Sequence, residues 1–120
     1  MSLTKTQQRI LYSLGNCYQN LNLPYQDKPL KVFISKIQFI DLVKKADFVR
    51  KQERALYKNL EILESKKLIE YQDKKIKLTQ KGNRVFNKIE KEIKPFIRIR
   101  EFWEQEIKSD RHLQTYMEKS

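Results

Sequence analysis

The chain has few of the residues that supply metal-binding or catalytic chemistry. Its 120 residues include one cysteine, one histidine and two glycines. One cysteine excludes a disulfide within the chain, and one cysteine with one histidine cannot form a Cys/His zinc site. Two isolated glycines exclude a glycine-rich phosphate loop, and His112 lies in a polar segment with no nucleophile beside it to activate. We therefore expect no metal, no cofactor and no enzymatic activity.

The chain also lacks a long run of apolar residues. No stretch approaches the ~20 residues that a helix needs to cross a bilayer. The first residues, MSLTKTQQR, lack the apolar centre of a signal peptide. We therefore expect a cytoplasmic protein that has no membrane partner.

Positive charge, by contrast, is in large excess. Lysine and arginine number 26 against 15 aspartates and glutamates, and the formal net charge is +11. A charge of this size attracts polyanions and steers their association, and nucleic acid is the usual partner. The alternative is a lysine-rich surface that reflects genome bias or a thermophilic habit, because lysine supplies most of the cations.

The stretch from Ala55 to Val85 predicts a helix, a short β-hairpin and the start of another helix. Leu56, Leu60 and Leu63 recur at helical spacing. Apolar and polar residues then alternate every second position over Leu68 to Tyr71 and over Lys75 to Thr79. The polar turn between these two segments is Gln72-Asp73-Lys74. A helix that runs into a basic hairpin is typical of winged-helix DNA-binding domains, in which the helix enters the major groove and the hairpin is the wing.

Two motifs in this stretch resemble those of MarR-like and PadR-like winged-helix regulators. The run from Tyr57 to Glu70 is similar to the family's Y-x-x-L-x-x-L-E-x-x-G-L-I-E, and Leu78 to Gly82 is similar to L-T-x-K-G. Lys67 stands where the family has glycine, and a non-glycine residue in a left-handed helix end costs about 1 kcal/mol. The resemblance implies a transcription regulator, and it implies no particular operator or small-molecule effector.

Helix ends and buried faces can be predicted in the first half of the chain. Thr4 and Gln7 form a capping-box pattern at the start of a first helix. Ser35 is placed to cap a second helix, after a candidate strand over Leu30 to Ile34 that would pair with the wing. The predicted inward residues are Ile10, Leu11, Leu14, Cys17, Tyr18 and Leu21 in the first helix, and Ile37, Ile40 and Val43 in the second.

The start of the third helix is the least defined boundary. Asp47 is a candidate cap, with Phe48 or Val49 filling the turn, and the helix is expected to begin a turn earlier than in the family. After the hairpin, Thr79 or Gln80 begins a fourth helix. Pro95 would cost about 3 kcal/mol inside it, so we expect a break near Lys94 and a last helix capped by Ser109-Asp110. The apolar face of the fourth helix is predicted to hold Val85, Phe86, Ile89, Ile93 and Ile97.

The predicted fold is therefore α+β and mostly α. It consists of a winged helix-turn-helix domain over residues 1–94 and extra C-terminal helices over residues 95–120, which we expect to dimerise.

On the third helix, the side opposite the leucines is predicted to carry the DNA-binding residues. At about 100° per residue, this side would hold Arg50, Lys51, Arg54, Tyr57 and Lys58, with Glu61 as the one opposing charge and Gln52 turned inward. Arginine can donate two hydrogen bonds to guanine, so Arg54, and after it Arg50, is the predicted base reader. The lysines are predicted to hold phosphates. A merely solvated charged face is the alternative.

Further phosphate contacts are predicted from the hairpin. Lys75 and Lys77 point outward if Ile76 and Leu78 point to the core, and Lys74 lies in the turn. A solvated turn is the alternative. Lys81 and Arg84 could add contacts, although cations in a first helical turn oppose the helix dipole.

The C-terminal segment is rich in large apolar residues. They would form a two-fold dimer interface, complete the monomer core by folding back on the first helix, or line a ligand pocket. We favour a homodimer, which would place two reading helices about 34 Å apart on double-stranded DNA. The interface residues would be Phe96, Ile99, Phe102, Trp103 and Ile107.

These predictions together indicate a dimeric, sequence-specific regulator that binds double-stranded DNA. Two alternatives remain open, because fold alone does not decide function. One is a winged-helix module that holds protein subunits together in a larger complex. The other is a nonspecific chromatin or RNA binder, which would show affinity without sequence preference.

Overall fold

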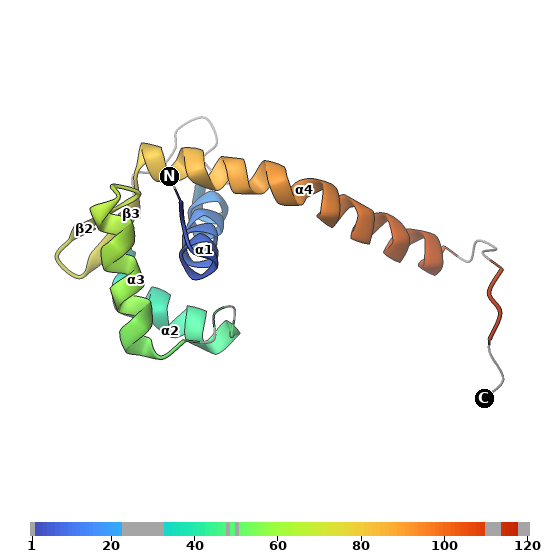
Figure 1. Ribbon diagram of the computed structural model, residues 1–120, viewed down its shortest axis with the longest axis horizontal. Coiled ribbons are helices and arrows are strands. Elements are labelled where there is room, and N and C mark those ends of the chain that lie inside the picture. Colours follow the sequence, from blue (N-terminus) through green and yellow to red (C-terminus); the bar gives the residue numbers. More distant parts are fainter. Residues whose placement is uncertain (1, 23–32, 48, 50, 110–113, 118–120) are drawn as a thin grey trace. The chain divides into compact units, whose positions relative to one another are not determined.

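The structure is a computed structural model that describes residues 2–22, 33–47, 49, 51–109 and 114–117 (Figure 1). The chain divides into two units, residues 1–89 and residues 90–120. The elements are α1 (Lys5–Asn22), β1 (Ile34–Ser35), α2 (Lys36–Ala46), α3 (Glu53–Ser65), β2 (Ile69–Gln72), β3 (Lys75–Leu78) and α4 (Gln80–Lys108). The strands form one antiparallel sheet in the order β1-β3-β2, so the predicted α+β, mostly helical class is confirmed.

Helix α1 begins with the predicted capping box. The Gln7 backbone N–H donates to Thr4 Oγ1 at 3.1 Å, and the Thr4 N–H donates to Gln7 Oε1 at 3.2 Å. Of the predicted inward residues, Ile10, Leu11 and Leu14 are fully buried, whereas Cys17 and Tyr18 are half-buried. Leu21 was predicted wrongly, since it is 46% exposed. It lies in the last turn of α1, beyond the buried residues of that helix.

Glycine allows α1 to approach the start of α4 closely. A Cβ atom on Gly15 would lie 2.1 Å from Phe86 Cδ1, so only glycine fits there without movement of the ring. Phe86 is fully buried, and its ring stacks on that of Tyr12 with centroids 5.2 Å apart. This contact fixes the first turns of α4 on α1.

Ser35 caps α2 as predicted, because its Oγ accepts a hydrogen bond from the Gln38 N–H at 3.3 Å. The predicted pairing of the first strand with the hairpin is also confirmed, with Ile34 opposite Ile76; residues 30–32 lie outside the described part. Ile37 was predicted wrongly, since it is 51% exposed. The buried face of α2 is formed by Phe39, Ile40 and Val43, and Ile37 lies about 110° from its centre.

The connection from α2 to α3 differs from the prediction. Asp47 ends α2 instead of capping α3: its φ is 57°, and its N–H donates to the Lys44 carbonyl at 3.2 Å. Val49 is buried as predicted, and Phe48 lies outside the described residues. The Lys51 N–H donates to the Val49 carbonyl at 3.0 Å. Residues 51 and 52 are not helical, and α3 begins only at Glu53.

The turn that ends helix α3 contains Lys67, a non-glycine residue in the left-handed conformation. The φ of Lys67 is 62°. The Leu68 N–H donates to the Leu63 carbonyl at 3.0 Å, and the Lys67 N–H donates to the Glu64 carbonyl at 2.8 Å. These two bonds form a Schellman motif, and the apolar pair that accompanies it is Leu63 and Leu68, both fully buried.

The predicted hairpin is present as β2 and β3, joined by the two residues Asp73 and Lys74. Asp73 has a φ of 57°, a conformation that Asp tolerates better than most residues. The inner face of the hairpin holds Ile69, Ile76 and Leu78, all buried. Figure 1 shows this hairpin beside α3.

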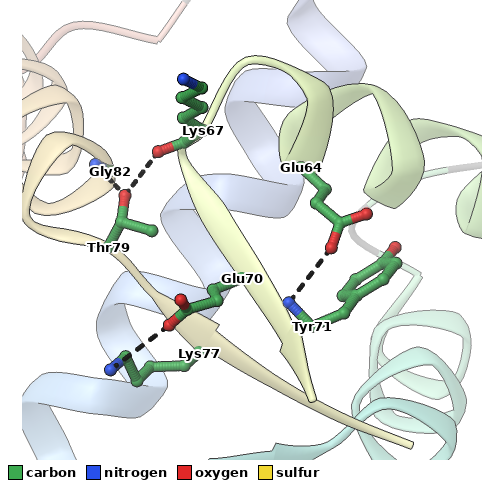
Figure 2. Close-up of polar contacts among 7 residues, drawn as sticks. All are labelled: Glu64, Lys67, Glu70, Tyr71, Lys77, Thr79 and Gly82. Carbon is green, nitrogen blue, oxygen red and sulfur yellow. Dashed lines mark hydrogen bonds and ion pairs between the residues drawn. The ribbon is translucent and has the colours of Figure 1, made fainter. Parts of the chain in front are cut away.

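Thr79 connects the end of the hairpin to both neighbouring helices (Figure 2). Its Oγ1 donates to the Lys67 carbonyl at 2.7 Å and accepts from the Gly82 N–H at 3.0 Å, and its own N–H donates to the Leu68 carbonyl at 3.1 Å. A Cβ on Gly82 would lie 2.0 Å from the Leu68 carbonyl oxygen. The motif L-T-x-K-G therefore connects the hairpin to α3 and α4. Thr79 makes the hydrogen bonds, and Gly82 allows the backbone of α4 to lie against the Leu68 carbonyl.

Helix α4 does not break at Pro95, so the expected break near Lys94 was wrong. The helix is continuous from Gln80 to Lys108 with Pro95 inside it. Proline removes one N–H donor, but Pro95 is exposed, so water can bond the carbonyl that loses its partner. In place of the expected extra C-terminal helices, α4 extends to Lys108, and the described residues beyond it, 109 and 114–117, are not helical.

The left-handed Lys67 yields a stability prediction. Lys67→Gly should raise the free energy of unfolding by about 1 kcal/mol, because glycine adopts this conformation without strain. Urea denaturation of the full chain measures the change. The neighbouring Lys66, with a φ of −86°, is the matched control: Lys66→Gly should lower stability by about 0.5–1 kcal/mol. Equal effects at the two positions would contradict the strain assigned to Lys67.

Candidate nucleic-acid interface

Helix α3 presents two cations to solvent from a fully packed inner side. Leu56, Leu60 and Leu63 are fully buried, as predicted. Arg54 and Lys58 are exposed and lie one turn apart, about 6 Å along the axis. Within the described part of the chain, neither has an ion-pair partner. Their guanidinium and ammonium groups are therefore available to an external anion.

The outer side of α3 is less purely basic than the sequence indicated. Because the helix begins at Glu53, Lys51 precedes it and does not share its face, although Lys51 is exposed. Gln52 is not turned inward: it is the exposed residue immediately before the helix. Arg50 lies outside the described residues. Glu61 is not the only acidic residue, since Glu53 is half-exposed and pairs with Lys44 of α2 at 3.5 Å.

An arrangement that the sequence analysis missed joins α2, α3 and the hairpin. Lys36 Nζ lies 5.6 Å from the ring centroid of Tyr57 and 4.9 Å from that of Tyr71. The Lys36 N–H also donates to the Lys74 carbonyl at 3.0 Å, which fastens the hairpin turn to the start of α2. We call Lys36, Tyr57 and Tyr71 the cation–π clamp. Tyr57 therefore supports the hairpin and is only partly exposed.

A carboxylate of α3 accepts a hydrogen bond from one backbone group at the edge of the hairpin. The Tyr71 N–H, on the edge strand β2, donates to Glu64 Oε2 at 3.2 Å (Figure 2). Burial, followed by the negative charges of Glu64 and Glu61, raises the pKa of Tyr71. Burial, followed by the charge of Glu53, raises the pKa of Tyr57 in the same direction. Both rings therefore stay neutral at neutral pH and keep the electron-rich faces that Lys36 contacts.

The cations of the hairpin are not equivalent. Lys74 and Lys75 are exposed, and no ion pair engages them in the described structure. Lys77 faces outward with Lys75, as predicted, but its Nζ is 3.4 Å from Glu70 Oε2 (Figure 2) and 5.3 Å from the centroid of the Phe33 ring. An exposed pair of this kind contributes about 0–1 kcal/mol, so an anion could displace Glu70 at modest cost.

Lys81 has a role within the protein. Its Nζ donates to the Lys66 carbonyl at 3.2 Å, at the C-terminal end of α3. A cation is favourable there, because the carbonyls at a helix C-terminus carry partial negative charge. This contact accounts for a lysine in the first turn of α4, where the dipole of α4 itself disfavours it. Arg84 is exposed and lies one turn further along.

The second unit carries large apolar side chains in solvent. Each of the predicted interface residues is at least half exposed, from 50% for Trp103 to 72% for Phe96. Phe102 and Trp103 contact each other edge to face, with ring centroids 5.2 Å apart.

No helix in the described ranges is long and apolar enough to span a membrane, and no three His, Cys, Asp or Glu residues there form a group that could hold a metal ion.

The cation–π clamp can be tested through stability. Tyr71→Phe keeps the ring face and should leave the free energy of unfolding within about 0.5 kcal/mol of the wild type. Tyr71→Leu keeps an apolar side chain but removes the ring, and should cost about 0.5–2 kcal/mol. Urea denaturation at neutral pH compares the two variants. Equal stability of the phenylalanine and leucine variants would contradict the clamp.

No family model, no curated protein and no solved structure matches the chain. What the chain binds is therefore inferred from the charge and geometry of its own residues.

Proposed function

We propose that this chain is a winged-helix transcription regulator that binds double-stranded DNA sequence-specifically as a homodimer. In this proposal α3 is the recognition helix and the β2–β3 hairpin is the wing. The order of the elements supports the proposal: three helices with a short strand between the first and second, a hairpin directly after α3, and then a long helix. No enzymatic activity, metal or cofactor is proposed.

The observation that carries the proposal is the exposed, unpaired state of Arg54 and Lys58 on α3. Both are backed by leucines that cannot move without opening the core, so a rigid helix presents them. A planar guanidinium can bond guanine O6 and N7 together, which discriminates bases by about 1–3 kcal/mol. Arg54 is accordingly assigned to base reading, and Lys58 to phosphate contact. Lys51, exposed just before the helix, is assigned to phosphate, and Arg50 remains a second candidate reader.

The hairpin is assigned to phosphate contacts beside this helix. Lys74 and Lys75 are free to bind, and Lys77 can join them by exchanging Glu70 for a phosphate. The cation–π clamp and the bond from Tyr71 to Glu64 hold the hairpin against α3. A positioned hairpin loses less conformational freedom on binding than a loose one does, which favours recognition by both elements together.

Homodimerisation is assigned to the C-terminal half of α4. Of the predicted interface residues, Phe96, Trp103 and Ile107 follow the spacing of three and four residues that characterises helix pairing, together with Ile93 and Arg100. Ile99 and Phe102 fall outside this series, about 60° and 120° from Phe96 around the helix. Large exposed apolar residues on one helix indicate a protein partner, and a second copy would give the symmetric arrangement usual in such regulators. A protein-interaction module is the second candidate function, because the same residues could bind a different protein.

Two substitutions on α3 test the reading and phosphate assignments separately. A preferred site is first selected from random duplexes, and binding is then measured by fluorescence anisotropy at several salt concentrations. Arg54→Ala should weaken binding to that site by about 1–3 kcal/mol and relax preference at one base pair. Lys58→Ala should lower the slope of log K against log salt by about one and weaken binding to all DNA sequences by the same factor. Lys45→Ala, which removes an exposed cation from α2, is the control. A uniform loss for Arg54→Ala would refute its role as a reader.

Trp103→Ala tests the dimer. Sedimentation velocity should show wild type as a dimer and the variant shifted towards monomer, because the largest ring of the interface is lost. Tyr116→Ala, at an exposed aromatic beyond α4, should remain dimeric. A wild-type monomer that still presents these side chains to solvent would contradict the homodimer and favour the interaction module.

A further inference from the structure

A chain of side-chain hydrogen bonds connects α1 to α3 inside the first unit, and no role assigned above uses it. Gln7 is 4% exposed and is the one buried polar side chain among the residues that the structure describes. Its Nε2 donates to Asn59 Oδ1 on α3 at 3.3 Å, while its Oε1 accepts from the Thr4 N–H. Asn59 Nδ2 in turn donates to the Ala55 carbonyl at 2.8 Å. We call the side chains of Gln7 and Asn59 the amide pair.

The bonding of the amide pair requires an amide at position 7. A glutamate, the other residue usual at this place in a capping box, could accept from Thr4 but could not donate to Asn59, and burial of its charge would be costly. Asn59 is also held at both ends, since its oxygen accepts from Gln7 and its nitrogen donates within α3. No buried side-chain nitrogen or oxygen in the described residues lacks a partner. A polar network that is fully satisfied holds its elements in one arrangement.

The amide pair lies at the level of the two exposed cations of α3. Asn59 follows Lys58 directly and lies about 7.5 Å along the helix axis from Arg54. The buried leucines of α3 hold the helix by contacts that have no preferred direction, and the exposed ion pair between Lys44 and Glu53 contributes little. A hydrogen bond, by contrast, requires a defined distance and angle. The amide pair therefore restricts sliding and rotation of this half of α3 on α1.

We propose that Gln7 and Asn59 are positioning residues for base reading, because the amide pair holds α3 where the Arg54 guanidinium can meet a base edge. The inference rests on the proposed function, in which Arg54 is the reader. Two hydrogen bonds to one guanine tolerate little displacement, whereas a lysine holds a phosphate as a point charge and tolerates more. Loss of the amide pair should therefore lower discrimination between DNA sites and leave the affinity for random duplex nearly unchanged.

The test replaces both amides of the full chain by apolar side chains of similar size, in a double variant with Gln7→Met and Asn59→Leu. Replacing both partners of a buried hydrogen bond in this way can be nearly neutral or stabilising, so the variant should melt close to wild type by circular dichroism. Thr4→Ala is the matched control: it removes the hydroxyl that caps α1, should lower the melting temperature, and keeps the amide pair. Asn59→Ala, which retains both bonds between Thr4 and Gln7, decides the question if the double variant does not fold.

Discrimination is the ratio of the Kd for random duplex to the Kd for the selected site, measured by fluorescence anisotropy. The double variant and Asn59→Ala should lower this ratio by about 5- to 150-fold, which corresponds to about 1–3 kcal/mol, with an unchanged slope of log K against log salt. Thr4→Ala should keep the wild-type ratio. An unchanged ratio in a folded amide variant, or an equal fall in Thr4→Ala, would overturn the positioning role while leaving the proposed function intact. If the wild type shows no preference between the two duplexes, the proposed function and this inference both fall.

Discussion

The turn at Lys67 and Leu68 is the constraint on which the arrangement of the first unit depends. It ends α3 through bonds to Glu64 and Leu63, and it receives two further bonds from Thr79 at the start of α4. Gly82 makes this approach possible, since any side chain there would meet the Leu68 carbonyl. The direction of the hairpin relative to α3 is fixed here, and with it the surface on which both elements present their cations.

The large positive charge divides into cations that hold the protein together and cations that remain available. Lys36 contacts two tyrosine rings, Lys81 bonds the end of α3, and Lys77 pairs with Glu70. In the described structure the exposed and unpaired members near α3 include Lys51, Arg54, Lys58, Lys74 and Lys75. Net charge alone cannot separate the two groups, because a lysine that stabilises an aromatic pair and one that binds a phosphate look alike in composition.

The features that the sequence predicted well are those determined by residues close together in the chain. The caps at Thr4 and Ser35, the start of α4 at Thr79 or Gln80, and the leucines of α3 depend on residues within one or two turns. The start of α3, only at Glu53, was not predicted, and the contacts of Lys36 with Tyr57 and Tyr71 were missed because they join positions far apart in sequence. Pro95 was misjudged because propensity ignores the solvent exposure of its helix. The candidate site was therefore found by residue type, while its geometry required the structure.

The central claim is that α3 and the hairpin contact duplex DNA together. The most direct measurement is a proton–nitrogen NMR titration of the full chain with a short duplex at moderate salt. The account predicts the largest amide shifts at residues 53–58 and 73–75, growing together with added DNA. Contradiction would come from a duplex that binds while both segments keep their free-protein positions, or from no change anywhere in the spectrum.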